Sequence, residues 1–106
     1  MLFRSRVLPL SRFLSRLIDS RPQIGEELRE ALHQPFAAQA MRDFLAAEAA
    51  EEATLRSGLR RLRARVMARI AARDLAGLAD LSEVTETMTT LADETVAHAE
   101  IGRAHV

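Results

Sequence analysis

The sequence predicts an all-α domain of four or five helices. Its apolar residues make up 48% of the chain, yet they are mostly Ala, Leu, Val, Ile and Met, with four Phe and no Trp or Tyr. The chain has only four Gly and three Pro, the two residues that most disfavour helix interiors. Apolar residues also recur at steps of three and four, which places them on one face of a helix. A chain of 106 residues suits one domain rather than two.

The first two helices are expected on either side of Pro22. The first should span about residues 10–18 and stop before Ser20-Arg21-Pro22. Pro22 suits the first turn of the second helix, which should run to about Leu32. The predicted buried residues are Phe13, Leu14, Leu17 and Ile18 in the first helix and Ile24, Leu28, Ala31 and Leu32 in the second.

A third helix is expected from about Ala37, after the break at Pro35. Its apolar residues are Met41, Phe44 and Leu45, and the pattern fades into the acidic, alanine-rich residues 46–53. The boundary with the next helix is therefore not marked by the sequence.

The fourth helix carries the most distinctive pattern in the chain. Seven arginines and no carboxylate fall within residues 56–73, so this segment has a net charge of +7. The predicted apolar stripe beneath them is Leu55, Leu59, Leu62, Val66 and Ile70. Gly77 is well placed to end the helix in the left-handed conformation. Such a helix could bind an anion, lie on a membrane, or face an acidic partner within its own fold.

The last helix should begin at Asp80, whose side chain can cap it, with Glu83 completing a capping-box-like pattern. Its predicted inner face is Val84, Met88, Leu91 and either Thr95 or Val96. Because the connection between helices four and five is short, the two should form an antiparallel hairpin.

Net charge alternates along the chain. It is +4 over residues 1–25, −5 over 26–55, +7 over 56–73 and −7 over 74–100. The hairpin should bring acidic side chains of the last helix alongside the arginines, namely Asp80, Glu83, Glu86, Asp93 and Glu94. We therefore expect solvated arginines paired within the fold. Docking on an acidic protein surface is one alternative, and nucleic-acid binding is another that the net charge of zero disfavours.

Residues that could carry chemistry are sparse, and the sequence predicts no catalytic, cofactor-binding or metal-binding residue. Cysteine is absent. His33, His98 and His105 lie too far apart in sequence to form a helical metal pair. No Asp-x-Asp pair is present to hold catalytic cations. The opening residues lack a signal-peptide core, and no window approaches the ~20 apolar residues of a membrane span, so we expect a cytoplasmic chain without membrane contact.

Part of the chain resembles a known family. The similarity rests on Leu59-Arg60-Arg61-Leu62-Arg63, Met67-Ala68-Arg69-Ile70, Arg73-Asp74-Leu75-Ala76-Gly77, Ala79-Asp80-Leu81 and Thr90-Leu91-Ala92-Asp93. This ordered series resembles a helical segment of the bacterial glutamine synthetase adenylyltransferases, closely over residues 55–99 and more loosely over 8–45. Leu62 departs from the family, which often has an aromatic residue there.

The resemblance implies a parent enzyme with two nucleotidyltransferase halves. One half adenylylates a tyrosine of glutamine synthetase from ATP, and the other removes the group by phosphorolysis. Mg²⁺ and ATP are the implied cofactors, and glutamine synthetase, the PII signal protein and a catalytic domain in cis are the implied partners. The segment resembles the opening of the N-terminal, adenylyl-removing half. The family's catalytic Gly-Ser and Asp-x-Asp signature lies downstream, and Ser57-Gly58 has the reverse order, so no catalytic role transfers to this chain.

The end of the chain predicts a foreign tail. Ile-Gly-Arg-Ala-His-Val, residues 101–106, resembles one reading frame of a sequencing adapter. We therefore expect residues 1–99 to be the N-terminal helical region of such an enzyme, as a fragment, and residues 100–106 to be adapter-derived. A free-standing helical interaction module and an arginine-helix nucleic-acid binder remain as alternatives.

Overall fold

The computed structural model describes residues 2–51 and 54–104, with side chains over 9–51 and 54–101. These residues form five helices and no strand. The helices are α1 (Leu2–Ser20), α2 (Pro22–Ala31), α3 (Ala38–Ala50), α4 (Leu55–Leu75) and α5 (Leu81–Ala104). The all-α prediction is confirmed.

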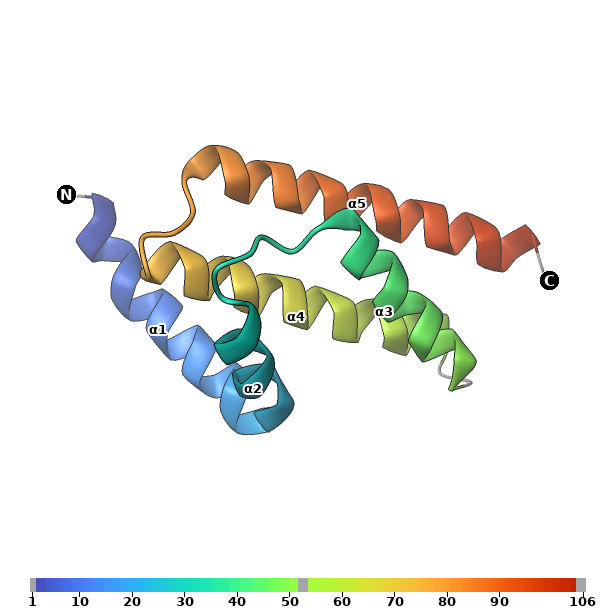
Figure 1. Ribbon diagram of the computed structural model, residues 1–106, viewed down its shortest axis with the longest axis horizontal. Helices are drawn as coiled ribbons and strands as arrows, with labels where there is room; N and C mark the ends of the chain where they lie inside the picture. Colours follow the sequence, from blue (N-terminus) through green and yellow to red (C-terminus); the bar gives the residue numbers. More distant parts are fainter. Residues whose placement is uncertain (1, 52–53, 105–106) are drawn as a thin grey trace.

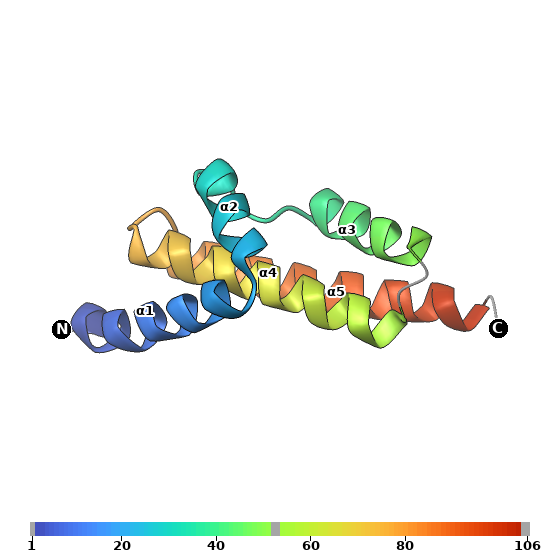
Figure 2. The same cartoon turned by 90° about the horizontal axis from the view of Figure 1, so that it is seen from below.

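The central element is α4, which packs against each of the other four helices. Figure 1 shows α5 running beside α4 in the opposite direction after the short connection at residues 76–80. In Figure 2, α1 and α2 lie over the C-terminal half of α4, whereas α3 lies over its N-terminal half. The molecule is elongated, about 50 × 28 × 21 Å.

The larger core lies between α3, α4 and α5. Its buried members are Phe36, Met41, Leu45, Leu62, Val66 and Leu91, with Phe44, Leu59 and Ile70 packed against them. Met41, Leu62 and Val66 are completely inaccessible to solvent. Every member except Phe36 belongs to a predicted apolar face, so the sequence pattern identified this core.

A second core lies on another side of α4, against α1 and α2. It contains Ile24, Leu28 and Ala68, with Leu14, Leu17, Ile18, Ala64 and Ala72 packed against them. Three alanines spaced by four residues form the α4 side of this contact. The apolar pattern of the sequence does not reveal this second buried face, because alanine contributes little to a hydrophobic pattern although it allows helices to approach closely.

Two residues that were predicted to be buried are exposed, Phe13 (39%) and Leu55 (40%), and so is Val96 (57%), which was one of two alternatives for the inner face of the last helix. Phe13 lies beside the narrow stripe by which α1 contacts α2 and α4. Leu55 is the first residue of α4, at the edge of the core. On α5, the half-buried Thr95 takes the inner position, and Val96 is rotated about 100° from it.

The start of α1 also differs from the prediction. The helix begins at Leu2 and includes Pro9, whereas the sequence predicted a start near Leu10. Proline removes one backbone hydrogen bond, but its fixed φ angle is itself helical, so helix can form on both sides of it. At the other end of the chain, α5 continues to Ala104, and His105 and Val106 lie outside the described residues.

Local signals fix the connection between α4 and α5. Gly77 adopts φ +73°, its N–H donates to the Asp74 carbonyl at 3.1 Å, and the Leu78 N–H donates to the Arg73 carbonyl at 2.8 Å. These two bonds form a Schellman motif, as expected for a glycine that ends a helix. The Asp80 carboxylate then accepts a hydrogen bond from the Glu83 N–H at 2.8 Å, which confirms the predicted cap.

Candidate functional site

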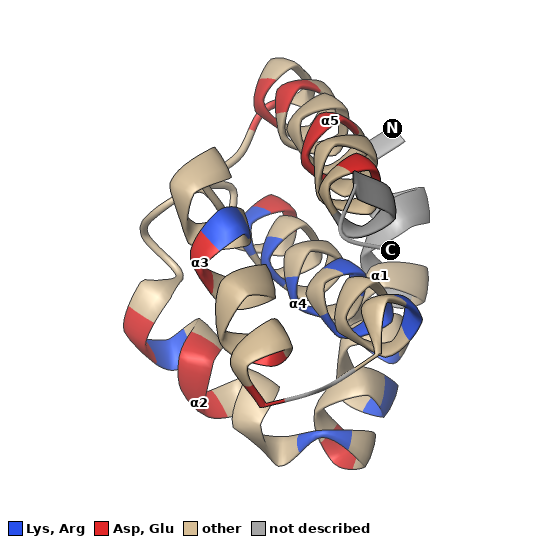
Figure 3. Ribbon diagram, turned by 90° about the vertical axis from the view of Figure 1, so that its right-hand side faces the viewer, with Lys and Arg blue, Asp and Glu red and all other residues tan. Residues whose placement is uncertain are grey.

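The arginines of α4 form two rows. The inner row is Arg61, Arg65, Arg69 and Arg73, spaced by four residues, and the outer row is Arg56, Arg60 and Arg63. At 100° per residue, the rows lie on either side of the apolar stripe that enters the larger core. Figure 3 shows basic residues distributed along α4 and acidic residues along α5.

Arg73 is 6% exposed, and its guanidinium joins three segments of the chain. Its Nε and Nη2 donate to Oε2 and Oε1 of Glu83 on α5 at 2.8 and 2.9 Å. Its Nη1 donates to the Leu32 carbonyl at 2.8 Å and its Nη2 to the Leu78 carbonyl at 3.0 Å. The hydrogen bonds to Glu83 raise the pKa of Arg73 above its usual value, because they favour the charged form.

Arg65 and Arg69 lie between the two cores. Their guanidinium carbons lie 5.0 Å from the ring centre of Phe44 and 4.3 Å from that of Phe36, respectively, which is cation–π geometry. Both also pair with Glu27 of α2, Arg65 through Oε2 and Arg69 through Oε1 at 3.7 Å. Burial lowers the pKa of each arginine, and the neighbouring charge of Arg73 lowers that of Arg69 further.

One polar group in this region is unsatisfied: Nε of Arg69 is buried and has no hydrogen-bond partner among the described residues. The Phe36 ring faces the same guanidinium and offers π-electron density in place of an acceptor. The inner row is therefore structural, holding α2, α3 and α5 to α4.

The ion pairs only partly match the prediction. Of the acidic residues expected to pair with α4, Glu83 does so, whereas Asp80 caps α5 and Glu94 lies 3.8 Å from Nε of Arg42 on α3. The other partners are Glu27 on α2 and Glu48 on α3, whose Oε2 lies 2.9 Å from Nη1 of Arg61. The expectation of solvated arginines is wrong for Arg69 and Arg73, which are buried.

The physical reason lies in how the helices are oriented. The side of α5 that faces α4 is largely apolar, and Glu86 and Asp93 are exposed. The inner row instead lies near α2 and α3, which bring their own carboxylates. The four-residue spacing shared by this row and by Ala64, Ala68 and Ala72 was the signal in the sequence that could have indicated a second buried face.

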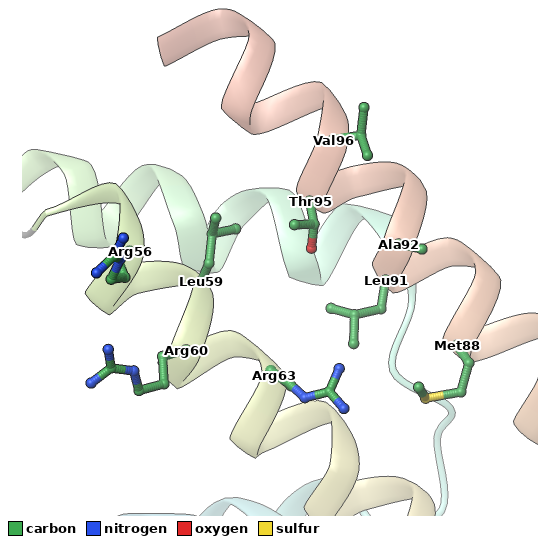
Figure 4. Close-up of a pocket in the computed structure, with 9 residues that line it drawn as sticks. All are labelled: Arg56, Leu59, Arg60, Arg63, Met88, Leu91, Ala92, Thr95 and Val96. Atoms are coloured by element: carbon green, nitrogen blue, oxygen red, sulfur yellow. The ribbon is translucent and has the colours of Figure 1, made fainter. Parts of the chain in front are cut away.

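The outer row lines a groove between α4 and α5 (Figure 4). Within the described part of the chain, none of its three arginines makes a hydrogen bond, ion pair or ring contact. The groove has a volume of about 520 Å³. Its other lining residues are Leu59 of α4 and Met88, Leu91, Ala92, Thr95 and Val96 of α5.

A second, more polar hollow of about 610 Å³ lies between residues 35–38 and the start of α5. Glu83 and Glu86 line it, but Glu83 is already paired with Arg73. No three His, Asp or Glu residues come together at metal-binding distance in the part of the chain that the structure describes. None of the helices, over the same residues, is long and apolar enough to cross a bilayer.

The fold and these contacts define an all-helical domain built around one arginine-rich helix. The family model for glutamate-ammonia ligase adenylyltransferase matches residues 4–103. The chain therefore belongs to the glutamate-ammonia ligase adenylyltransferase family, as the sequence resemblance predicted.

Curated relatives agree with this assignment, and each is named a bifunctional glutamine synthetase adenylyltransferase/adenylyl-removing enzyme. The chain is 50% identical to the Nitrosomonas eutropha enzyme over 87% of the residues of this chain. It is 51% identical to the Aromatoleum aromaticum enzyme over 82% of the residues of this chain. Identity to the Chromobacterium violaceum enzyme is 41% over 90% of the chain. The matches cover 10%, 9% and 11% of these relatives, so the chain spans about a tenth of their length. No solved structure matches it.

Proposed function

We propose that this chain is the N-terminal helical scaffold of a bifunctional enzyme that adenylylates and deadenylylates a tyrosine of glutamine synthetase and so regulates nitrogen assimilation. The observation that carries the proposal is the identity of about half the residues, over most of the chain, to enzymes with those two named activities. The regulatory partner would be the PII signal protein, as the family resemblance implies.

The residues of this chain do not fit a metal–nucleotide site. Such a site needs paired carboxylates to hold the cations, and the sequence has no Asp-x-Asp. The carboxylates nearest to the arginines are already engaged, Glu27, Glu48 and Glu83 in ion pairs. ATP and Mg²⁺ would therefore bind to other parts of the enzyme, and this chain would contribute no reacting group.

The packing supports a scaffold role. One helix, α4, holds every other helix, and four of its seven arginines are used to fasten α2, α3 and α5. A domain organised in this way can present fixed surfaces to a neighbouring catalytic domain.

The proposal is tested with a chimera of this chain and a related enzyme. The segment of the Aromatoleum aromaticum enzyme that matches this chain is replaced by residues 1–99, and adenylylation and deadenylylation of glutamine synthetase are measured with labelled ATP and with phosphate. We expect the chimera to retain both activities and an otherwise identical deletion variant to lose them. The isolated chain should show no turnover of either reaction above a blank without protein.

Either of two results would contradict the proposal. Turnover by the isolated chain would show that it carries catalytic groups of its own. A chimera that is folded, as judged by circular dichroism, but inactive in both directions would show that the chain does not serve as this scaffold.

A further inference from the structure

The groove between α4 and α5 combines an exposed apolar surface with positive charge that no described residue pairs with. Met88, Leu91, Ala92, Thr95 and Val96 recur on α5 at the spacing of one continuous helical stripe. The larger core covers only part of this stripe: Leu91 is 4% exposed, whereas Val96 is 57% exposed. The groove is thus the outer half of an apolar face whose inner half is buried.

The wall formed by α4 adds the charge. Arg56, Arg60 and Arg63 are exposed and lack partners among the described residues. In Figure 4, Arg63 extends from α4 toward the part of α5 that carries Met88 and Leu91. The remaining four arginines of the helix are all paired, so the outer row stands out as the part of the basic helix that the described residues leave without partners.

The dimensions suit two turns of another helix. Along α4, the outer row spans about 10 Å, and the stripe on α5 spans about 12 Å, at 1.5 Å per residue. A helix with carboxylates at positions i, i+4 and i+7 repeats the spacing of the arginines, and its adjacent apolar side chains would face the stripe. Charge complementarity of this kind fixes orientation and register.

We propose that the groove binds an acidic amphipathic helix contributed by the remainder of the same polypeptide. The source in cis rests on the proposed function, under which this chain is about a tenth of a longer enzyme, as it is of its relatives. An anionic membrane would also attract arginines, but its apolar region needs a protruding apolar surface, whereas this stripe lines a hollow. Nucleic acid would leave the stripe uncovered.

The first test uses the 106-residue chain and a designed peptide. A fluorescent amphipathic peptide with leucine along one face and glutamate beside it is titrated with the chain, and its anisotropy is recorded. A matched peptide with lysine in place of glutamate is the control, because it keeps the helical pattern and the apolar face and reverses only the charge. We expect the acidic peptide to bind and the basic peptide not to bind.

Two double variants with the same change in charge locate the site. Arg60→Glu with Arg63→Glu should weaken binding about tenfold or more, because two attractions become repulsions. Arg12→Glu with Arg16→Glu, on the exposed side of α1, should change it by less than about twofold. Val96→Asp should also weaken binding, and the circular dichroism spectrum of each variant confirms that it is folded.

Several results would overturn the proposal. Equal weakening by both double variants would show that binding follows net charge alone. Capture by phosphatidylserine vesicles that depends on Arg60 and Arg63, without binding of the peptide, would assign the groove to membranes. A dimer in analytical ultracentrifugation that Arg60→Glu with Arg63→Glu dissociates would assign it to a second copy of the chain.

A second experiment tests the source of the helix. A photo-crosslinking amino acid is placed at position 96 of the chimeric enzyme, and the crosslinked peptide is identified by mass spectrometry. We expect the crosslinked peptide to come from an acidic helical segment of the same polypeptide. A crosslink to another protein, or no crosslink at all, would contradict the proposal that the helix belongs to the same polypeptide. The peptide titration does not require an active chimera, so failure of the proposed function and failure of the groove proposal remain distinguishable.

Discussion

Arg73 shows how a charged side chain can become part of a helical core. Its planar guanidinium presents several N–H groups in fixed directions, and these meet one carboxylate and two backbone carbonyls from different segments. A lysine could not reproduce this pattern, because its ammonium group is a single point of charge with no planar fork.

Arg73→Met should therefore destabilise the fold by about 2–4 kcal/mol, because it leaves Glu83 and two carbonyls unpaired in a partly buried site. Arg60→Met, on the exposed outer row, is the matched control and should change stability by no more than about 0.5 kcal/mol. Urea unfolding followed by far-UV circular dichroism measures both. Equal effects of the two substitutions would show that the contacts of Arg73 do not hold the helices together.

Leu62 and Leu55 allow a second comparison within α4. Leu62 is completely buried, so Leu62→Ala should cost about 2–5 kcal/mol, a large part of the stability of a small domain. Leu55 is 40% exposed, and Leu55→Ala should cost less than about 1 kcal/mol. Thermal unfolding of the two variants checks the order, and a larger loss for Leu55→Ala would mean that the buried face of α4 is misassigned.

At the scale of elements, boundaries with local chemical signals could be predicted from the sequence. Pro22 starts α2, and Gly77 and Asp80 separate α4 from α5. The start of α1 could not be predicted, because Pro9 lies inside the helix and conceals its continuation. The second face of α4 was also hidden, since its contact with Ile24 and Leu28 is made by alanines.

Gly77 provides the test at this scale. Gly77→Ala should destabilise the chain by about 1–2 kcal/mol, because a side chain is strained in the left-handed region. Apart from Gly77 and its two chain neighbours, no described heavy atom lies within 4 Å of the added Cβ, so the loss reports backbone conformation. Gly77→Asn should cost less, since asparagine tolerates this conformation. If unfolding experiments give alanine no penalty, the Schellman ending of α4 does not contribute as described.

For the whole molecule, the sequence predicted that opposite charges meet within the fold and named Glu83 among the partners of α4, but it did not predict the pairs made by Glu27 and Glu48. Pairing depends on the rotation of each helix about its axis, and only the packed structure determines that Glu27 and Glu48 face the inner row. The groove could not be predicted from the sequence either, because the apolar pattern left open whether Thr95 or Val96 faces the core and so did not show which of them stays exposed.

The distribution of free charge predicts weak binding to nucleic acid. With four of the seven arginines of α4 paired, duplex DNA should bind no more tightly than the ~10⁻⁴ to 10⁻⁶ M of non-specific contacts. If the three outer arginines alone contact phosphates, log K should fall against log salt with a slope no steeper than about −3. Fluorescence anisotropy over a salt series measures both, and submicromolar affinity would favour a nucleic-acid binder.

The position of α4 between two cores also has a mechanical consequence. Its alanine face holds α1 and α2, while its outer row forms one wall of the groove, and a single helix carries both. A rotation of α4 about its axis would therefore move the surface on which α1 and α2 pack. The same rotation would change the width of the groove. A ligand that rotated α4 on binding in the groove would therefore also alter how α1 and α2 pack.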